Sequence, residues 1–520
     1  MRCLTLFTAL GLVVTTACSD SSLNFATDDA GAIESDGDYA DTGAASGEDD
    51  DADDGFGGEQ EEDELALFPA ATERYVFVAN PDRDTVSRIG VSSLDVLTVG
   101  VGAEPISVLT TPDYSTAVTF NARGETVSIV DADTLAVADV GVRANFNKMV
   151  MSPDGQWVLV YHDVDSDEPV SGDDAVTSYN EVSLVHLDGE EHWPIVVGFN
   201  PRQVQFSADS SVVAVVSDQA LAVIDLWSDD PGDIDVIEIA EDNGDPPRAE
   251  EVVITPGGEF AVVRQYAEDD LVLVDLETLD VSRFPVGLNP TDLDLSPDGT
   301  LMYVVARTSQ EVSWFEADAP DVLVGNVGLP PDELIGSLQL TSDGELGVLY
   351  TTAALEDRYT VWDLATDEME VRTLVKPIET LALSPSGESM MIFHTKEDAA
   401  DADTSSSFYD AWAMSLIDLD DHRANRLELP AEPSGYAQSD DGAFGFFIME
   451  GEPYLEVLKY DSLLYEQLEL HAQPLYVGVL PDTDTAYVDQ EHDLGQLSFY
   501  DAAADVLETI TGFELNAEIE

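Results

Sequence analysis

Short runs of apolar or alternating residues recur along residues 73–520 and are separated by clusters of polar turn residues. The stretch 286–325 shows the unit, with the runs TDLDLS, LMYVVA and EVSWFEAD and the turn SPDG between the first two. Runs of about four to seven residues that are rich in β-branched and aromatic side chains predict strands, because an amphipathic helix would need a longer pattern with a period near 3.6. The pattern therefore predicts an all-β fold made of short strands.

A related tight turn recurs along the chain and divides it into units. In turns such as SPDG, Pro fixes φ at the first turn position, Asp or Ser bonds to the backbone, and Gly accepts a positive φ. Successive turns are 41 to 55 residues apart, which predicts one structural unit per forty-odd residues with insertions. The nine turns are centred on Pro112, Pro153, Ala208, Pro256, Pro297, Ser342, Pro385, Asp440 and Pro481.

An acidic residue closes the third strand of most units. We interpret these residues as Asx-turn formers that lead into the last hairpin, rather than as metal ligands. They are Asp131, Asp225, Asp275, Asp363, Asp418, Asp461 and Asp501.

Four short antiparallel strands in each repeat predict the blades of a β-propeller, which must stack on their neighbours to bury both faces. The pattern VG..P, then SPDG, then an LMYVV-like strand and a third strand ending in D resembles the bacterial YVTN or lactonase-like propeller repeats. The resemblance covers nearly all of 73–520. It implies a propeller fold, and it leaves open the lactonase or dehydrogenase activity that some propellers have.

The two ends of the repeat region predict how the ring closes. The first unit, 74–101, starts directly at a second strand, and residues 510–520 begin a further first strand after the last complete unit. The C-terminal strand is therefore expected to complete the first blade, giving a single ring of about ten blades. Seven or eight blades, or two tandem rings, are the alternatives. The absence of a linker near 300–345 argues against two rings.

The N-terminal region predicts export and a lipid anchor. A positive start is followed by an apolar run of about a dozen residues, too short to span a bilayer. The sequence Thr15-Thr16-Ala17-Cys18 resembles a bacterial lipoprotein signal, in which Cys18 would be lipidated; an ordinary secretory peptide is the alternative. We expect residues 1–17 to be a signal peptide, 18–66 an acidic disordered tether and 67–520 the propeller. Ser19 after Cys18 favours, by analogy with that family, the outer membrane, on its periplasmic or cell-surface side.

The chain is strongly acidic, with 107 Asp and Glu against 19 Lys and Arg and a net charge of −88. Nucleic-acid binding is not expected, because phosphate neutralisation requires clustered basic residues. We favour adaptation to high salt over a multivalent cation-binding surface.

The run at 49–58 is not an EF-hand loop, because Asp54 occupies the position that requires Gly. Cys3 and Cys18 are the only cysteines, so the processed protein has no disulfide and no thiol chemistry beyond Cys18.

Two long units are each other's closest relatives and suggest an ancestral five-blade duplication. Residues 152–188 and 384–420 each carry a His nine residues after the turn Pro and a long acidic insertion that contains a Tyr. Five blades apart, the two insertions would face each other over one mouth of the channel. The ligand-face candidates there are His162, His394, Tyr179 and Tyr409. Carboxylates in the insertions could bind Ca²⁺, although solvated loops are favoured; these are Asp163, Asp165, Asp167, Asp401 and Asp403.

Four of the few cations lie near the starts of blades: Lys148, Arg202, Arg248 and Lys376. They could bind an anion or pair with the acidic loops, and we favour pairing.

With no thiolate, zinc-spaced His pair or hydrolase motif in the propeller region, we predict a lipid-anchored, non-catalytic binding or scaffold protein of the cell envelope. The alternatives are a lactonase- or dehydrogenase-like enzyme using polar groups at the channel mouth, and a cation-responsive scaffold. The expected partners are the membrane through the lipid and an unknown protein or small molecule. We expect a monomer and no cofactor other than the candidate Ca²⁺.

Overall fold

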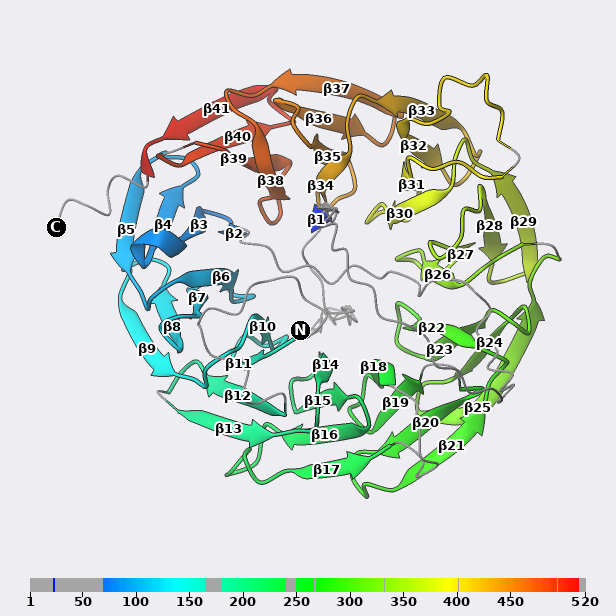
Figure 1. Cartoon of the computed structure of the whole chain (residues 1–520), viewed down its shortest axis with the longest axis horizontal. Helices are drawn as coiled ribbons and strands as arrows, with labels where there is room; N and C mark the ends of the chain where they lie inside the picture. Colours follow the sequence, from blue (N-terminus) through cyan, green and yellow to red (C-terminus); the bar gives the residue numbers. More distant parts are fainter. Residues whose placement is uncertain are drawn as a thin grey trace, which may run out of the picture.

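The computed structural model describes residues 22–23, 69–163, 180–189, 191–239, 249–265, 268–331, 333–400, 402–492 and 494–513. These residues form strands β1 to β41 and one 3-10 helix, η1 (Pro81–Arg83). The strands make ten antiparallel sheets, arranged as the blades of one propeller (Figure 1). The predicted all-β propeller of ten four-stranded blades is confirmed, and the alternatives of seven or eight blades are wrong.

Each blade uses four strands that are consecutive in the sequence and ordered from the centre of the ring to its rim. Blades one to five comprise β2 (Ala70–Ala71), β3 (Tyr75–Asn80), β4 (Thr85–Gly90), β5 (Val96–Gly100); β6 (Pro105–Thr110), β7 (Thr116–Asn121), β8 (Thr126–Asp131), β9 (Val137–Gly141); β10 (Lys148–Met151), β11 (Trp157–Tyr161), β12 (Glu181–His186), β13 (His192–Val196); β14 (Pro201–Phe206), β15 (Val212–Ser217), β16 (Ala220–Asp225), β17 (Asp235–Glu238); and β18 (Ala249–Ile254), β19 (Phe260–Gln265), β20 (Asp270–Asp275), β21 (Val281–Pro285).

The second half of the ring repeats this order. Blades six to ten comprise β22 (Pro290–Leu295), β23 (Leu301–Ala306), β24 (Glu311–Glu316), β25 (Ala319–Gly328); β26 (Ser337–Leu340), β27 (Leu346–Tyr350), β28 (Arg358–Asp363), β29 (Glu368–Thr373); β30 (Ile378–Leu383), β31 (Ser389–His394), β32 (Trp412–Asp418), β33 (Ala424–Leu429); β34 (Pro433–Gln438), β35 (Phe444–Met449), β36 (Tyr454–Lys459), β37 (Leu464–Glu469); and β38 (Pro474–Val479), β39 (Thr485–Gln490), β40 (Gln496–Asp501), β41 (Val506–Thr511).

The recurring turn joins the first and second strands of a blade, as its chemistry predicts. In the turn at 152–155, the Ser152 hydroxyl donates to Asp154 Oδ1 at 2.6 Å and the Gly155 amide donates to the Ser152 carbonyl at 2.9 Å. Gly155 has a φ of 66°, a left-handed conformation that glycine adopts without strain. Six of the seven strand-closing aspartates, all except Asp461, accept a hydrogen bond from a following backbone amide, as the predicted Asx turns require. Asp275 Oδ1, for example, accepts from the Thr278 amide at 2.7 Å.

Ten hydrophobic clusters of buried residues lie at the junctions between neighbouring blades, one for each junction of a closed ten-bladed ring. At the midpoint of the chain, Phe284 of blade five packs in one cluster with Phe315 of blade six, and their rings meet edge to face at 5.2 Å. The last blade is joined to the first by a cluster containing Val76, Ile89, Tyr487 and Phe513. This arrangement is one ring and excludes two tandem rings.

The closure itself differs from the expected strand exchange within the described residues. The inner position of the first blade is filled by β2, which pairs with β3 through Ala70 and Ala71. Tyr487 of the last blade donates its hydroxyl to the Pro69 carbonyl at 2.9 Å. Residues 514–520, on which the predicted C-terminal closing strand depends, lie outside the described residues.

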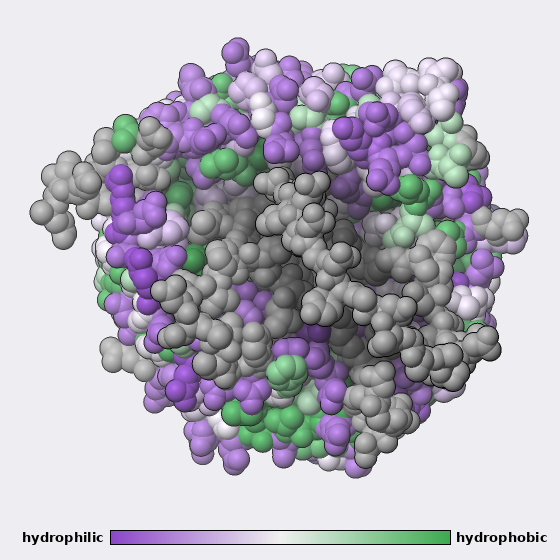
Figure 2. Space-filling view, viewed as in Figure 1, coloured by the Kyte–Doolittle hydropathy of each residue, from purple (hydrophilic) through white to green (hydrophobic). Residues whose placement is uncertain are grey.

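The N-terminal region contributes one short element. Strand β1 (Ser22–Leu23) pairs antiparallel with β34, the inner strand of blade nine, although it falls within the predicted tether. The rest of 1–68, including Cys18 and the predicted signal peptide, lies outside the described residues. Among the described residues, no helix has the length and apolar character needed to cross a membrane. Hydrophilic side chains cover much of the rim on the face shown in Figure 2.

Candidate functional site in the insertion of blade eight

A buried lysine holds the insertion of blade eight against the start of the blade. Lys376 precedes β30, and its side chain is 0% exposed. Its ammonium donates to Asp398 Oδ1 at 2.8 Å, to the Lys396 carbonyl at 2.7 Å and to the Phe408 carbonyl at 3.2 Å. All three acceptors belong to the insertion between β31 and β32. A charge this deeply buried is stable only when its donors are satisfied, so Lys376 fixes the path of the insertion.

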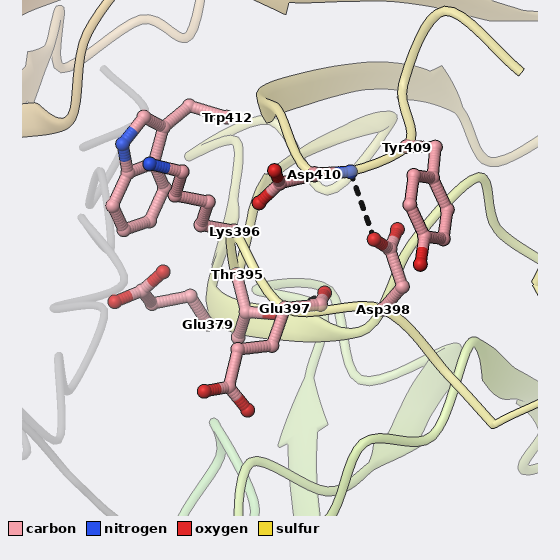
Figure 3. Close-up of a pocket in the computed structure, with 8 residues that line it drawn as sticks. All are labelled: Glu379, Thr395, Lys396, Glu397, Asp398, Tyr409, Asp410 and Trp412. Carbon is pink, nitrogen blue, oxygen red and sulfur yellow. Dashed lines mark hydrogen bonds between the residues drawn. The ribbon is translucent and has the colours of Figure 1, made fainter. Parts of the chain in front are cut away.

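Asp398 links Lys376 to the far end of the insertion. Its other oxygen, Oδ2, accepts from the Asp410 amide at 2.8 Å, a bond drawn in Figure 3. One carboxylate thus joins the start of the blade, the first part of the insertion and the residues that lead into β32.

His394 lies beneath this insertion rather than on its surface. It ends β31, is 0% exposed, and has Nδ1 3.1 Å from the Pro377 carbonyl and Nε2 2.8 Å from the Ser415 hydroxyl. Burial lowers the pKa of His394 to about 4, so the ring is neutral at pH 7. Its full burial is that of a packing residue.

A cavity of about 610 Å³ opens between β30 and the insertion (Figure 3). Its wall combines carboxylates, two aromatic rings, a threonine and one ammonium group. The lining residues are Glu379, Thr395, Lys396, Glu397, Asp398, Tyr409, Asp410 and Trp412. Of the ligand-face candidates, the structure brings Tyr409 into this wall. Asp403, a candidate Ca²⁺ ligand on the same insertion, does not line the cavity and accepts from Ser405.

Glu379 is the group in this cavity with the most perturbed protonation. It lies on β30 and, within the described residues, makes no hydrogen bond or ion pair. Burial, with a smaller effect of the nearby Glu432 carboxylate, raises the pKa of Glu379 to about 7. Near neutral pH this group therefore exchanges between a carboxylic acid and a carboxylate, a property common in functional sites.

The corresponding position in blade three is built differently. Lys148, the first residue of β10, pairs with Asp163 Oδ2 at 3.2 Å, and both side chains are about nine-tenths buried. The Asn147 side chain donates to the Asp163 carbonyl at 2.9 Å and accepts from its amide at 2.7 Å. His162 is 8% exposed, and burial lowers its pKa while the Asp163 charge opposes that shift. Tyr179, Asp165 and Asp167 lie outside the described residues.

Of the other predicted site residues, one forms an ion pair and two lie outside the described residues. Arg202 at the start of blade four pairs with Asp218 at 2.5 Å, so Lys148, Arg202 and Lys376 each face a carboxylate. Arg248 and Asp401 lie outside the described residues. No group of three or more His, Cys, Asp or Glu side chains in the described part of the chain is placed to hold a metal ion.

Sequence reasoning missed Glu379, Glu397, Asp410 and Trp412. A signal existed in the inner strand: Glu379 stands in the apolar run IETLAL, where an acid needs an explanation. The pairing of this strand with the insertion depends on Lys376, and that contact was not evident from sequence spacing.

Residues 148–330 match the family described as "Lactonase, 7-bladed beta-propeller". This range contains blades three to six, from β10 to β25, so the match covers the repeat and not the number of blades. The predicted resemblance to lactonase-like repeats is confirmed over this range. No curated protein matches the chain.

Several solved structures resemble this chain at low sequence identity. A eukaryotic initiation factor is 12% identical with a TM-score of 0.51, over 76% of this chain and 96% of that chain. Dihydro-heme d1 dehydrogenase NirN in complex with DHE is 18% identical with a TM-score of 0.45, over 68% and 73% of the two chains. Hydrazine synthase of Kuenenia stuttgartiensis is 18% identical with a TM-score of 0.30, over 59% and 95%. These likenesses concern fold alone. The chain is a ten-bladed β-propeller whose blades three to six match the lactonase-like propeller family.

Proposed function

We propose that this protein is an exported, lipid-anchored β-propeller that binds a cationic ligand in the blade-eight cavity without catalysing a reaction on it. The supporting observation is the cavity itself, in which Glu379, Glu397 and Asp410 share a wall with Trp412. Carboxylates attract ammonium and guanidinium groups, and an aromatic face adds about 0.5–2 kcal/mol when a cation lies over it. Binding proteins commonly present such a mixed wall in a preformed cavity.

The fixed geometry of the cavity favours binding over a solvated acidic loop. Asp398 is already committed to Lys376 and the Asp410 amide, so the insertion is ordered before a ligand arrives. Less entropy is then lost on binding. The Lys396 ammonium also lines the cavity and would compete with the ligand for the same carboxylates, which limits affinity for singly charged ligands.

The test is calorimetric titration of the full chain with a trilysine peptide at constant ionic strength. Replacing two wall carboxylates, in E397Q/D410N, removes the local attraction and is expected to weaken binding roughly tenfold, about 1.4 kcal/mol. The charge-matched control D403N/E388Q changes two carboxylates outside the cavity and is expected to bind like the wild type. Equal weakening in both double variants would mean that the peptide responds only to overall charge, and would reject the site.

The resemblance to lactonase-like repeats supports a second candidate, hydrolysis with Glu379 as general base. A carboxyl group with a pKa of about 7 is suited to that role at neutral pH. Lactone turnover by the wild type that is lost in E379Q would favour this enzyme over the binder.

Anchoring is tested separately from ligand binding. The wild type is expected to fractionate with membranes and C18A in the soluble fraction, because Cys18 would carry the lipid. Equal release of both proteins into the soluble fraction would contradict the anchor and leave the cavity proposal intact.

A further inference from the structure

A second cavity lies at the rim of the ring, between blades seven and eight, and its charge is opposite to that of the molecule. It encloses about 280 Å³ and is lined by residues of β28, β29, β32 and β33, among them Tyr359, Arg372, His422 and Arg426. Strands β29 and β33 are the outer strands of their blades (Figure 1). We call this cavity the rim cavity. It is separate from the cavity of the proposed cationic ligand.

Arg426 contributes a guanidinium group that the described residues leave unused. It makes no hydrogen bond or ion pair with them, although the chain has 107 acidic residues against 19 Lys and Arg. Arg423, on the same hairpin, shows the usual arrangement: it pairs with Asp418 at 2.9 Å and with Asp421 at 2.7 Å. An unpaired arginine beside a cavity is therefore unusual in this protein.

Two other groups of the rim cavity also have spare hydrogen-bonding capacity. Arg372 Nε and His422 Nδ1 are buried without a hydrogen-bond partner in the described residues. Glu370 occupies only part of this capacity, with Oε2 at 2.5 Å from Arg372 Nη2 and 3.8 Å from His422 Nε2. Buried polar groups normally have partners, so unused ones beside a cavity point to a ligand.

The phenol of Tyr359 lies within the influence of both guanidinium groups. Burial raises its pKa to about 12, and the positive charges of Arg372 and Arg426 oppose that shift. Both arginines line the same cavity as this phenol. A neutral phenol there offers one more O–H donor.

We propose that the rim cavity binds a phosphate- or sulfate-type oxyanion. Two guanidinium groups, an imidazole and a phenol provide several donors around one small space, and arginine suits the planar, forked recognition of oxyanions. Glu370 acts as an internal competitor, because its carboxylate holds Arg372 and lies beside His422 when no anion is bound. The exposed side chain of Glu370 can turn away when an anion enters.

The duplicated half of the ring provides an internal comparison. With the two long units aligned at Pro153 and Pro385, the position of Arg426 is Pro194 in blade three, and that of Arg423 is Glu191. Blade three therefore lacks the cation at this place. The rim cavity is a property of blade eight and not of the repeat.

The experiment is calorimetric titration of the full chain with inorganic phosphate and, separately, with sulfate, at ionic strength held constant with sodium chloride. We expect saturable binding by the wild type, at least tenfold weaker in R426Q and in R372Q. R423Q, the matched control, is expected to stay within twofold of the wild type. E370Q is expected to bind severalfold more tightly, because it removes the internal competitor.

The outcomes separate this proposal from a general charge effect and from the proposed function. Absence of saturable binding at 50 mM phosphate, or equal weakening in R423Q and R426Q, would overturn the rim site. Unchanged thermal unfolding of each variant verifies that the fold is retained. E397Q/D410N is expected to keep its phosphate affinity, so failure of the cationic-ligand proposal would leave this result unaffected.

Discussion

Blades three and eight have related sequences, yet the lysine–aspartate pair at the start of each insertion makes different contacts. Buried His394 ends the second strand of blade eight, and buried His162 directly follows the second strand of blade three. In both blades a lysine–aspartate pair lies where the insertion begins. In blade three the pair joins Lys148 to Asp163, the residue directly after His162. In blade eight Lys376 reaches Asp398, four residues beyond His394, and two carbonyl groups of the insertion as well.

The difference shows that related sequence patterns keep a buried histidine at a matching position without keeping the contacts of the neighbouring lysine–aspartate pair. Lys148 and Lys376 are not equivalent under the 232-residue offset of the two units, which places Thr380 opposite Lys148. Each blade has a different solution for tying its insertion to the inner strand. In blade eight a cavity lies between the inner strand and the insertion.

The largest effect is expected from removing the buried ammonium of blade eight. K376M would leave Asp398 without its cation, and losing one partner of a buried ion pair typically costs about 3–5 kcal/mol. We expect a lower thermal unfolding midpoint and faster proteolysis at 395–411. K396M, which changes an ammonium that forms no ion pair in the described residues, is the control; similar losses in both variants would refute the anchoring role of Lys376.

A smaller effect is expected from the two histidines, and it depends on pH. The folded-state pKa of His394 is about 4, below the ordinary value near 6.5. The unfolded chain therefore takes up the proton first, and stability falls as the pH drops from about 6.5 toward 4, by up to about 3 kcal/mol. H394N lacks this proton uptake and should flatten the stability profile over that range.

The control for this measurement is the equivalent residue of blade three. The pKa of His162 is also lowered by burial, but His162 is less completely buried than His394, so H162N should flatten the profile less. Thermal unfolding between pH 4.5 and 7.5 measures both profiles. A wild-type profile that is flat below pH 6.5 would contradict the burial of a neutral His394.

The fold was predictable from the sequence because its determinants are local and repeated. The turn at 295–299 specifies its own conformation through Ser296, Asp298 and Gly299, and the Asx turn after Asp275 does the same for the last hairpin. Nine copies of the turn, together with the strand pattern of the first unit at 74–101, indicate ten blades. The closure was less predictable, because a two-residue strand such as β2 carries almost no sequence signal.

The candidate site was predictable only in part, for a physical reason. The long acidic insertions directed attention to blades three and eight, and Tyr409 of blade eight lines the cavity. His162 and His394 are both buried, and the His394 imidazole contacts the Pro377 carbonyl and the Ser415 hydroxyl. The cavity wall depends on which inner-strand residue meets which loop residue, and these contacts have no fixed sequence spacing.

The smallest effect is expected from calcium. If the carboxylates of the two insertions bind Ca²⁺ with a dissociation constant near 0.1–1 mM, as weak extracellular sites do, 5 mM Ca²⁺ would stabilise the fold by roughly 1–2 kcal/mol. The thermal midpoint with 5 mM CaCl₂ should then exceed that with NaCl of equal ionic strength. Equal midpoints would mean that salt affects stability only by screening the net charge of −88.

In the described structure, the four strands of every blade are consecutive in the sequence, and only the sheet of blade nine gains a strand from elsewhere, the two-residue β1. The seam between the last blade and the first is held by Tyr487, Phe513 and their neighbours, through the same kind of contact that joins the other nine pairs. Such a circle can be opened at a different seam, or gain and lose a whole repeat, without altering the pairing inside any blade. This modularity offers a simple physical route by which a five-blade ancestor could double its circumference and still close.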